Sequence, residues 1–348
     1  MKITIDGHDI DVEAGTTILQ AARMIGGECV PPTMCYYSKL KDCGGKCRCC
    51  LVEVTKGSER DPRPMPKLQP SCVTLVQEGM EVLSAKSPKA LEARKAVTEF
   101  LLINHPLDCP VCDQAGECDL QNLAFNNGAY KSRYIEEKRT FEPEDIGPHI
   151  QLHMNRCVLC YRCVKLAEQL TDGRVHGVLN RGDHAQISTY VSQVIDNDFS
   201  GNMVDVCPVG ALTDKTYRFE SRVWFNKPFN AHRDCPKCSG KVVLWMFGDT
   251  IQRVNAPKDE FHEVEDFICN ECRFDHKNVN DWIIDGPRKF EKFSVININN
   301  YTKKLDKVEI IADDLILEGR KQDQEKISMS EFPYDEAELE AIKKTKEE

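Results

Sequence analysis

The sequence has 348 residues, of which 41% are hydrophobic, and a formal net charge of −10. This content is enough for two or three small domains with hydrophobic cores, and it argues against a disordered chain. Lysine and arginine are interleaved with acidic residues, so no basic face for nucleic acid is indicated. The opening MKITIDGHDIDVEAG has no apolar signal core, and runs such as VVLWMF are too short to cross a bilayer. We therefore expect a soluble cytoplasmic chain that meets a membrane only through partners.

The first 84 residues are expected to form a small mixed sheet with one helix. Apolar and polar residues alternate on both sides of Asp6-Gly7, a dipeptide that favours a two-residue hairpin turn. The segment TTILQAARMIG has helical spacing, with Thr16 or Thr17 as N-cap and Gly26 at its end. CLVEVTKG and MEVLSA are interpreted as further strands.

A second helix is predicted to begin with Ser87 as N-cap and Pro88 as its first residue. The helix places Leu91, Val97 and Leu101 on one face, and it ends shortly before His105. The charged end of the sequence, YDEAELEAIKKTKEE, is expected to be a solvated helix or disordered.

The 18 cysteines are the most informative feature of the sequence. In a chain without an export signal, clustered cysteines usually bind metal or do redox chemistry rather than form disulfides. The first group is Cys35, Cys43, Cys47, Cys49, Cys50 and Cys72. A glycine-rich loop and one distant cysteine suit a [2Fe-2S] cluster, in which each iron needs two thiolates. Cys47 and Cys50 form a C-x2-C step, but Cys35 and Cys43 both remain possible as the first ligand; structural zinc is the alternative.

The second group combines a histidine with three cysteines. Cys109, Cys112 and Cys118 need a fourth ligand to hold a [4Fe-4S] cluster, and His105 is the candidate. The competing interpretation is that His105 caps the preceding helix, where its imidazole would lie at the negative end of the helix dipole. Pro106 cannot continue that helix and so turns the chain.

The third group is Cys157, Cys160 and Cys163, followed by Cys207 in a Cys-Pro pair. In two-cluster bacterial ferredoxins, each cysteine run gives its fourth cysteine to the other cluster. Here the second run is missing, and so is the cysteine that the first run would give to it. Both omissions agree with one remaining [4Fe-4S] cluster, which Cys207 completes.

The fourth group consists of two C-x2-C pairs separated by 30 residues, Cys235, Cys238, Cys269 and Cys272. Such pairs are typical of a zinc ribbon, although a [4Fe-4S] cluster needs the same number of ligands. The four groups together use 15 of the 18 cysteines and leave Cys29, Cys43 and Cys49. No nucleotide-binding motif or catalytic triad accompanies them, so the pattern predicts an electron carrier within a larger enzyme.

The motifs CYYSKL, KCRCCLVEV, NHPLDCPVCDQAGECDLQ, RCVLCYRC and VDVCPVGALTDK together resemble the G subunit of bacterial NADH:quinone oxidoreductase, respiratory complex I. The resemblance covers residues 1 to about 275. It implies a [2Fe-2S] cluster on Cys35, Cys47, Cys50 and Cys72, and [4Fe-4S] clusters on His105, Cys109, Cys112 and Cys118 and on Cys157, Cys160, Cys163 and Cys207. It further implies that electrons pass from a flavoprotein subunit, which oxidises NADH at FMN, toward quinone, with no NADH or quinone site on this chain.

The same resemblance implies partners in the peripheral arm of complex I and a location at the cytoplasmic side of the inner membrane. The chain departs from the family pattern in three ways. The loop from Cys35 to Cys47 is one residue longer than usual. Val242 stands where many members have the third cysteine of an additional [4Fe-4S] site, and Cys272 compensates for it, which favours zinc at the fourth group. No molybdopterin-enzyme-like domain follows, so we expect a short form.

Two other functions fit part of the pattern. The diaphorase iron-sulfur subunit of an NAD-reducing hydrogenase shares the first three cluster motifs, but such subunits are expected to end near residue 220. A structural metal-binding scaffold without electron flow leaves three redox-type sites unexplained.

The expected fold class is α+β, in five segments. They are a β-grasp [2Fe-2S] ferredoxin-like domain (1–84), a helix with the segment of one histidine and three cysteines (85–139), a [4Fe-4S] ferredoxin-like domain (140–220), a small four-Cys metal module (221–280) and a partly disordered extension (281–348).

Overall fold

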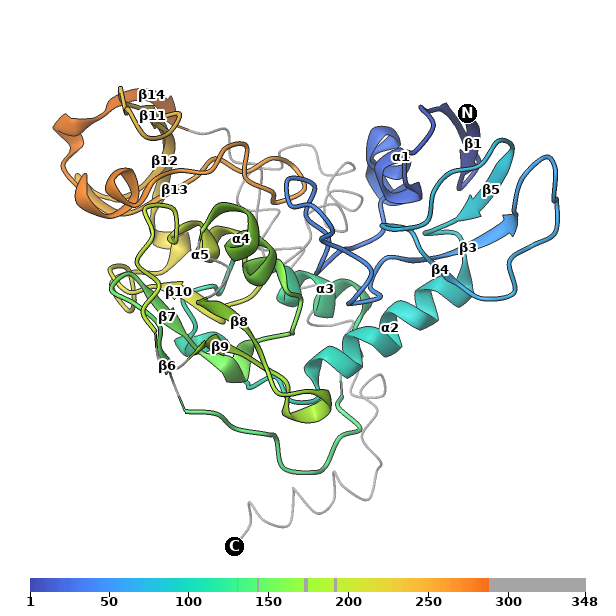
Figure 1. Ribbon diagram of the computed structural model, residues 1–348, viewed down its shortest axis with the longest axis horizontal. Helices are drawn as coiled ribbons and strands as arrows, with labels where there is room; N and C mark the ends of the chain where they lie inside the picture. Colours follow the sequence, from blue (N-terminus) through green and yellow to red (C-terminus); the bar gives the residue numbers. More distant parts are fainter. Residues whose placement is uncertain (130, 143, 172–174, 191–192, 288–348) are drawn as a thin grey trace, which may run out of the picture. The chain divides into compact units, whose positions relative to one another are not determined.

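The N-terminal residues form a five-stranded mixed sheet with the strand order β2-β1-β5-β3-β4 (Figure 1). The computed structural model of the chain describes residues 1–287, apart from 130, 143, 172–174 and 191–192. In the sheet, β1 and β5 are parallel and the other neighbours are antiparallel. The strands are β1 (Lys2–Ile5), β2 (His8–Asp11), β3 (Leu51–Lys56), β4 (Gln69–Pro70) and β5 (Met80–Leu83).

The predicted hairpin at Asp6-Gly7 is confirmed. Ile5 pairs with His8 across the turn, and both turn residues have positive φ, 51° for Asp6 and 89° for Gly7. This is the conformation that a two-residue hairpin requires and that Asp-Gly accepts at low cost. The buried Asp6 carboxylate also accepts backbone N–H bonds from Ser84 at 2.8 Å and Ala85 at 2.9 Å, so the turn is fastened to the end of β5.

Helix α1 (Ile18–Ile25) covers the buried face of this sheet. Thr17 is its N-cap: the Thr17 hydroxyl accepts from the Gln20 N–H, and the Gln20 side chain accepts from the Thr17 N–H, which is a complete capping box. Ile18 packs in one hydrophobic cluster with Ile3 and Ile5 of β1. The predicted helix, with its cap at Thr17 and its end at Gly26, is confirmed.

Helix α2 (Pro88–Leu102) begins where predicted, because the Ser87 hydroxyl accepts a hydrogen bond from the Ala90 N–H. The predicted face is confirmed in part: Val97 and Leu101 pack against the hydrophobic core, whereas Leu91 is 44% exposed. The fully buried positions are Ala90, Arg94 and Thr98. Arg94 donates to the Leu51 carbonyl at 3.2 Å and to the Ser84 hydroxyl at 2.9 Å. The helix therefore packs through Val97 and its C-terminal leucines together with hydrogen-bonding residues, while Leu91 faces solvent.

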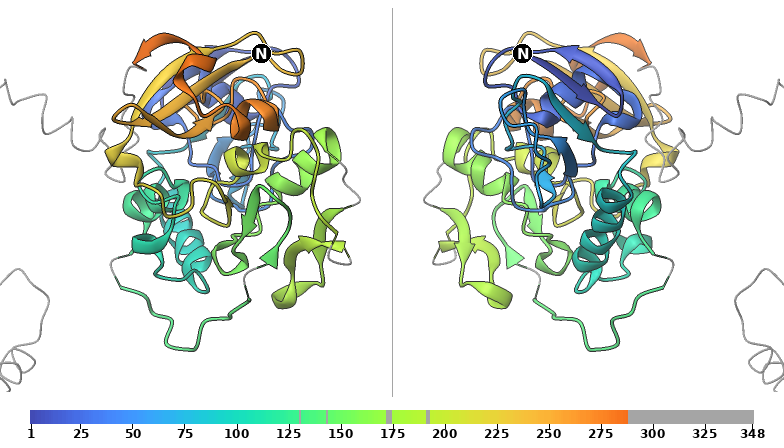
Figure 2. Two further views of the ribbon diagram at one scale, coloured as in Figure 1. Left: turned by 90° about the vertical axis from the view of Figure 1, so that its left-hand side faces the viewer. Right: turned by 90° about the vertical axis from the view of Figure 1, so that its right-hand side faces the viewer.

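The middle of the chain holds short helices and two small antiparallel sheets, visible in green in Figures 1 and 2. Helix α3 packs against α2, and α4 against α5 and β8. The sheets have the orders β10-β7-β6 and β8-β9. The elements are α3 (Asp119–Asn127), β6 (Glu144–Asp145), β7 (Ile150–Leu152), α4 (Arg162–Leu170), β8 (His176–Leu179), β9 (Gln186–Thr189), α5 (Asn202–Val206) and β10 (Leu212–Asp214).

The last described residues form a four-stranded antiparallel sheet with the order β13-β12-β11-β14. A π-helical turn, Glu271–Asp275, contacts β13. The strands are β11 (Lys227–His232), β12 (Lys241–Phe247), β13 (Thr250–Asn255) and β14 (Ile283–Pro287). The charged tail that was predicted to be a solvated helix or disordered lies outside the described residues. Within the described part of the chain, the helices are too short or too polar to span a bilayer.

Candidate functional site

The first cysteine group lies at the edge of the N-terminal sheet, on the loop before β3 and on the turn after β4. Cys35, Cys50 and Cys72 are buried, and Cys47 is half-buried. Their thiols interact closely enough to shift one another's pKa: the neighbouring Cys47 raises the pKa of Cys35, and Cys50 raises that of Cys72. Two sulfurs for each of two irons is the distribution that a [2Fe-2S] cluster requires.

Backbone N–H groups of the glycine-rich loop point at these sulfurs. Gly45 donates to Cys72 Sγ at 3.2 Å, and Lys46 and Cys47 each donate to Cys35 Sγ at 3.4 Å. Such bonds stabilise thiolates and tune cluster potentials. The Cys43 thiol instead donates to the Cys35 carbonyl at 3.0 Å and packs in the hydrophobic core. The donor set therefore fits a [2Fe-2S] cluster, and this arrangement favours Cys35 over Cys43.

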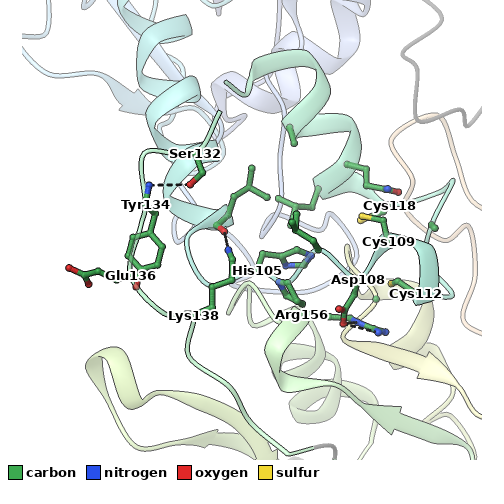
Figure 3. Close-up of a pocket in the computed structure, with 18 residues that line it drawn as sticks. His105, Asp108, Cys109, Cys112, Cys118, Ser132, Tyr134, Glu136, Lys138 and Arg156 are labelled. Carbon is green, nitrogen blue, oxygen red and sulfur yellow. Dashed lines mark hydrogen bonds and ion pairs between the residues drawn. The ribbon is translucent and has the colours of Figure 1, made fainter. Parts of the chain in front are cut away.

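The second group lines a cavity of about 320 Å³, and Figure 3 shows His105, Cys109, Cys112 and Cys118 together on its wall. His105 follows the end of α2, and Cys118 is the N-cap residue of α3. Burial, together with the nearby Lys138 and Arg156 charges, lowers the pKa of His105 to about 4. The imidazole is therefore neutral at pH 7, which is the form that binds metals.

The helix-capping role that competed for His105 is taken by another residue. The Lys138 ammonium donates to the carbonyls of Leu102 at 3.1 Å and Ile103 at 2.8 Å, at the C-terminal end of α2. The His105 Nδ1 atom is buried and has no hydrogen-bond partner within the described structure. A buried ring nitrogen without a partner is unfavourable unless something else binds there. The His105 ring thus fits a metal ligand better than a cap.

The loop after Cys207 closes the second cavity. Gly210 lies so near Cys112 that a Cβ atom on Gly210 would be 2.2 Å from Cys112 Sγ. The Cys118 thiol and the Asp119 N–H both donate to the Pro208 carbonyl, at 3.8 and 3.1 Å. One short loop therefore connects the second and third cysteine groups.

This contact gives a test of the second site. Gly210→Ala should displace Cys112 and remove the cluster of the His105 group, because a methyl group cannot share space with a ligand sulfur. We expect the iron content, measured on anaerobically purified chain, to fall by about four atoms. Gly44→Ala is the control, since its backbone conformation suits any residue and a Cβ there would lie at an ordinary contact distance of 3.5 Å from Cys72 Sγ. An unchanged iron content and unchanged electron paramagnetic resonance signals in Gly210→Ala would contradict the assignment.

The third group surrounds a narrow apolar cavity lined by Cys157, Cys160, Cys163 and Cys207. Cys163 lies in the first turn of α4, and Cys207 follows α5 directly. Leu159 and Tyr161, on either side of Cys160, have left-handed φ values of 50° and 66°. Such backbone is unusual for non-glycine residues and is found mainly where a site constrains it.

Burial raises the pKa of the Cys160 and Cys163 thiols well above the ordinary value. Thiols in so apolar a cavity stay protonated unless a metal replaces the protons. Four cysteines around one cavity match the donor set of a [4Fe-4S] cluster.

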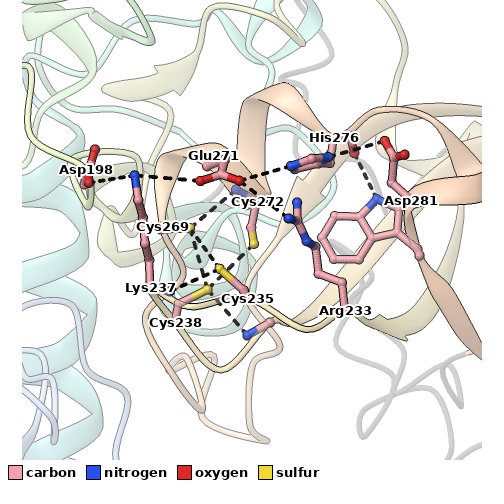
Figure 4. Close-up of polar contacts among 12 residues, drawn as sticks. Asp198, Arg233, Cys235, Lys237, Cys238, Cys269, Glu271, Cys272, His276 and Asp281 are labelled. Carbon is pink, nitrogen blue, oxygen red and sulfur yellow. Dashed lines mark hydrogen bonds and ion pairs between the residues drawn. The ribbon is translucent and has the colours of Figure 1, made fainter.

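The fourth group is the most compact. The ligand atoms of Cys235, Cys238, Cys269 and Cys272 all lie within 4.8 Å of one another. Among the described residues, no other set of three or more histidine, cysteine or acidic side chains is gathered so closely. Cys235 and Cys238 lie between β11 and β12, and Cys272 is part of the π-helical turn (Figure 4).

Sequence reasoning missed three kinds of residue that shape these sites. It did not identify Gly210 as a contact of Cys112 or Lys138 as the cap of α2. It also missed Asn270, whose side chain binds the segment that leads to Cys207. Only Gly210 carried a local signal, because a glycine three residues after a proposed ligand suggests close approach to a metal site.

Three family models match the chain. Residues 1–87 match a 2Fe-2S iron-sulfur cluster binding domain, and residues 94–133 match the NADH-ubiquinone oxidoreductase-G iron-sulfur binding region. Residues 147–213 match the ferredoxin-like domain of NADH-quinone oxidoreductase subunit 3. These matches confirm the predicted α+β class with ferredoxin-like [2Fe-2S] and [4Fe-4S] domains. The fourth cysteine group lies beyond the matched residues.

Several relatives carry the same family name. The chain is 38% identical to the G subunit of NADH-quinone oxidoreductase from Rickettsia bellii (strain RML369-C), over 82% of this chain and 40% of the relative. It is 44% identical to the corresponding G subunit of Rickettsia prowazekii (strain Madrid E), over 64% of this chain and 31% of the relative. The NADH-ubiquinone oxidoreductase 75 kDa subunit of Reclinomonas americana is 37% identical to the chain, over 82% of this chain and 40% of the relative. The chain thus spans less than half the length of these curated relatives.

A solved structure is also similar. A chain of an NAD+-reducing [NiFe]-hydrogenase in the H2-reduced state superposes with a TM-score of 0.55 and 27% identity. The similarity covers 64% of this chain and 90% of the hydrogenase chain. The two proteins therefore share a fold over most of the hydrogenase chain.

Proposed function

Because this chain belongs to the family of the G subunit of NADH-quinone oxidoreductase, we propose that it carries electrons from an NADH-oxidising FMN subunit toward quinone. The observation that carries the proposal is that three separate ligand sets lie within the residues matched by three iron-sulfur family models. Iron-sulfur clusters accept and release single electrons when bound. The protein residues hold them, adjust their potentials and exclude water.

The proposed ligands are those expected from the sequence. Cys35, Cys47, Cys50 and Cys72 would hold a [2Fe-2S] cluster. His105, Cys109, Cys112 and Cys118 would hold one [4Fe-4S] cluster, and Cys157, Cys160, Cys163 and Cys207 a second. The shared loop Pro208–Gly210, which contacts both Cys118 and Cys112, supports a fixed separation between the two [4Fe-4S] clusters. A fixed separation is what electron transfer between sites needs.

The proposed surroundings follow from the same family. The partners would be an FMN- and NADH-binding flavoprotein subunit and other peripheral-arm subunits, at the cytoplasmic side of the inner membrane. The proposed domain limits are those given above, with the cluster-bearing domains ending near residue 220.

The similarity to a hydrogenase chain favours one alternative, the diaphorase iron-sulfur subunit of an NAD-reducing hydrogenase. The residues 221–287, with their own sheet and cysteine group, argue for the first proposal, since such subunits are expected to end near residue 220. A purely structural scaffold would not explain why three separate segments match iron-sulfur family models.

Metal analysis of the anaerobically purified chain tests the function. We expect about ten irons in the three clusters, and co-purification with an FMN-binding partner. Fewer than about six irons in an intact preparation would exclude the proposed electron path. Stable association with a hydrogenase instead would favour the alternative.

His105→Cys gives a second test. A neutral imidazole makes a cluster less negative than a thiolate does, and therefore easier to reduce. The variant should keep a cluster at this site but lower its reduction potential, measured by redox titration followed by electron paramagnetic resonance. An unchanged potential and spectrum would mean that His105 does not bind the cluster.

A further inference from the structure

The fourth cysteine group has the dimensions of a site for one ion. Cys269 Sγ lies 3.7 Å from Cys235 Sγ and 3.7 Å from Cys238 Sγ, and Cys238 Sγ lies 3.7 Å from Cys272 Sγ (Figure 4). Zinc binds cysteine at about 2.3 Å, so two sulfurs of a tetrahedral zinc site are separated by about 3.8 Å. The separations in this group match that value.

A [4Fe-4S] cluster does not fit the same sulfurs. In a cube each thiolate binds a different iron, so the four sulfurs surround the whole cluster and lie much farther apart than around a single ion. Among the described residues, only the fourth group has its ligand atoms within 4.8 Å of one another. This short spacing distinguishes it from the three proposed cluster sites.

Backbone N–H groups around these cysteines donate hydrogen bonds to the sulfurs, which stabilises thiolates. The N–H of Lys237 donates to Cys235 Sγ at 3.5 Å, that of Gly240 to Cys238 Sγ at 3.4 Å, and that of Cys272 to Cys269 Sγ at 3.5 Å. Gly240 has a φ of +66°, and a Cβ there would lie 2.0 Å from the Arg233 carbonyl oxygen. The turn after Cys238 thus requires glycine, and it places the N–H groups toward the sulfurs.

We propose that Cys235, Cys238, Cys269 and Cys272 bind a single zinc ion, which is redox-inert and lies outside the electron path. Tetrahedral four-sulfur sites suit zinc, and zinc binds a given site more tightly than ferrous iron does. Four thiolates around Zn²⁺ carry a net charge of −2. The cations Arg233 and Lys237 lie beside the first cysteine pair, where they also form ion pairs with Glu271 at 3.5 and 3.7 Å (Figure 4). The proposal does not depend on whether the chain carries electrons.

The zinc ion would act by fixing one segment against another. The segment with Cys269 and Cys272 also holds Asn270, whose Nδ2 donates to the Asn197 carbonyl at 2.8 Å and whose Oδ1 accepts from the Gly201 N–H at 2.9 Å. Asn202 in turn donates to the Ile268 carbonyl at 2.7 Å. These bonds attach the zinc-binding segment to α5, the helix that ends immediately before Cys207.

The experiment uses the full chain, purified anaerobically with its iron-sulfur clusters. We expect about one zinc per chain in addition to the iron, and X-ray absorption at the zinc edge should show four sulfur neighbours at about 2.3 Å. Cys238→Ser should lower the zinc content of the chain at least fivefold and leave its iron content unchanged. It should also raise the rate of amide hydrogen exchange in residues 197–205 about tenfold or more. Cys29→Ser is the control, because Cys29 belongs to none of the four groups.

If Cys238→Ser cannot be purified, Cys238→His replaces it, and this variant should retain zinc because sites with three cysteines and one histidine also bind zinc. Four additional irons with no zinc would overturn the proposal in favour of a cube. One additional iron with no zinc would overturn it in favour of a redox-active single-iron site. Low iron with one zinc would contradict the proposed function but leave this inference standing, so the two failures are distinguishable.

Discussion

Replacing Cys207 with alanine should remove one [4Fe-4S] cluster and stop electron transfer through the chain. Cys207 is the only proposed ligand of the third group that comes from outside the C-x2-C-x2-C run, and it lines the same cavity as Cys157, Cys160 and Cys163. With three ligands left in an apolar cavity, the cluster would lack a thiolate that nothing nearby can replace. We expect iron to fall from about ten to about six atoms per chain.

The measurement combines iron analysis with electron paramagnetic resonance of the dithionite-reduced chain. The [2Fe-2S] signal should persist in Cys207→Ala, because its proposed ligands lie on the loop before β3 and the turn after β4, in the N-terminal part of the chain. Cys43→Ala is a matched control: Cys43 is also a buried cysteine, but its thiol donates to a backbone carbonyl. If every cluster signal survives in Cys207→Ala, Cys207 is not a ligand and the third site must be reassigned.

Asp205→Asn should destabilise the chain strongly, because Asp205 belongs to a fully buried ion pair. The Asp205 carboxylate and the Arg273 guanidinium form an ion pair whose side chains are 0% and 1% exposed. Arg273 also donates to the Val254 carbonyl at 3.3 Å, and Asn255 donates to Asp205 at 2.8 Å. The neutral variant would leave a buried cation without a counter-ion, which costs about 3–5 kcal/mol.

This cost should lower the melting temperature by about 10 °C in scanning fluorimetry of the cluster-loaded chain. Glu99→Gln is the control. Glu99 pairs with Arg133, which is 84% exposed, and such surface ion pairs contribute less than about 1 kcal/mol to the free energy of unfolding. The double variant Asp205→Leu with Arg273→Met should recover part of the loss, since it removes both charges. A melting temperature within about 2 °C of the parent chain in Asp205→Asn would show that water or rearrangement satisfies Arg273.

Local features of the fold could be predicted from the sequence because their causes lie within a few residues. The Asp6-Gly7 turn, the Thr17 capping box and the Ser87 cap each depend on contacts between near neighbours. The buried face of α2 was predictable only in part. Val97 and Leu101 pack on the core as predicted, but the burial of Arg94 depends on its bonds to the distant Leu51 carbonyl and Ser84 hydroxyl, which helical spacing does not show.

For the candidate sites too, some features could be predicted from the sequence and others required the structure. Cysteine spacing predicted which side chains form each group, but spacing alone left Cys35 and Cys43 open and His105 between two roles. The structure bears on both questions through contacts that spacing does not reveal, namely the Cys43 bond to the Cys35 carbonyl within the loop and the long-range capping of α2 by Lys138. The choice between one zinc ion and a cube depended on distances between sulfurs, which a C-x2-C pattern does not contain.

Glu263 connects the beginning of the chain to its later part. Its buried carboxylate accepts from Arg23 at 2.7 Å, across 240 positions of sequence, and from the Ser38 N–H at 2.8 Å. The neighbouring Val264 N–H donates to the Tyr37 hydroxyl at 2.7 Å. These contacts join α1 and the loop that carries Cys35 to the segment around residue 263, and the Arg162 guanidinium holds the same loop by donating to the Tyr36 carbonyl at 2.9 Å.

During synthesis, the cysteines of the first group leave the ribosome long before Glu263 does. At about 5–20 residues per second, the interval is on the order of 10–50 s. Throughout that time the loop around Cys35 lacks the buried carboxylate of Glu263. The contacts that join this loop to the later part of the chain can therefore form only after most of the chain has been made.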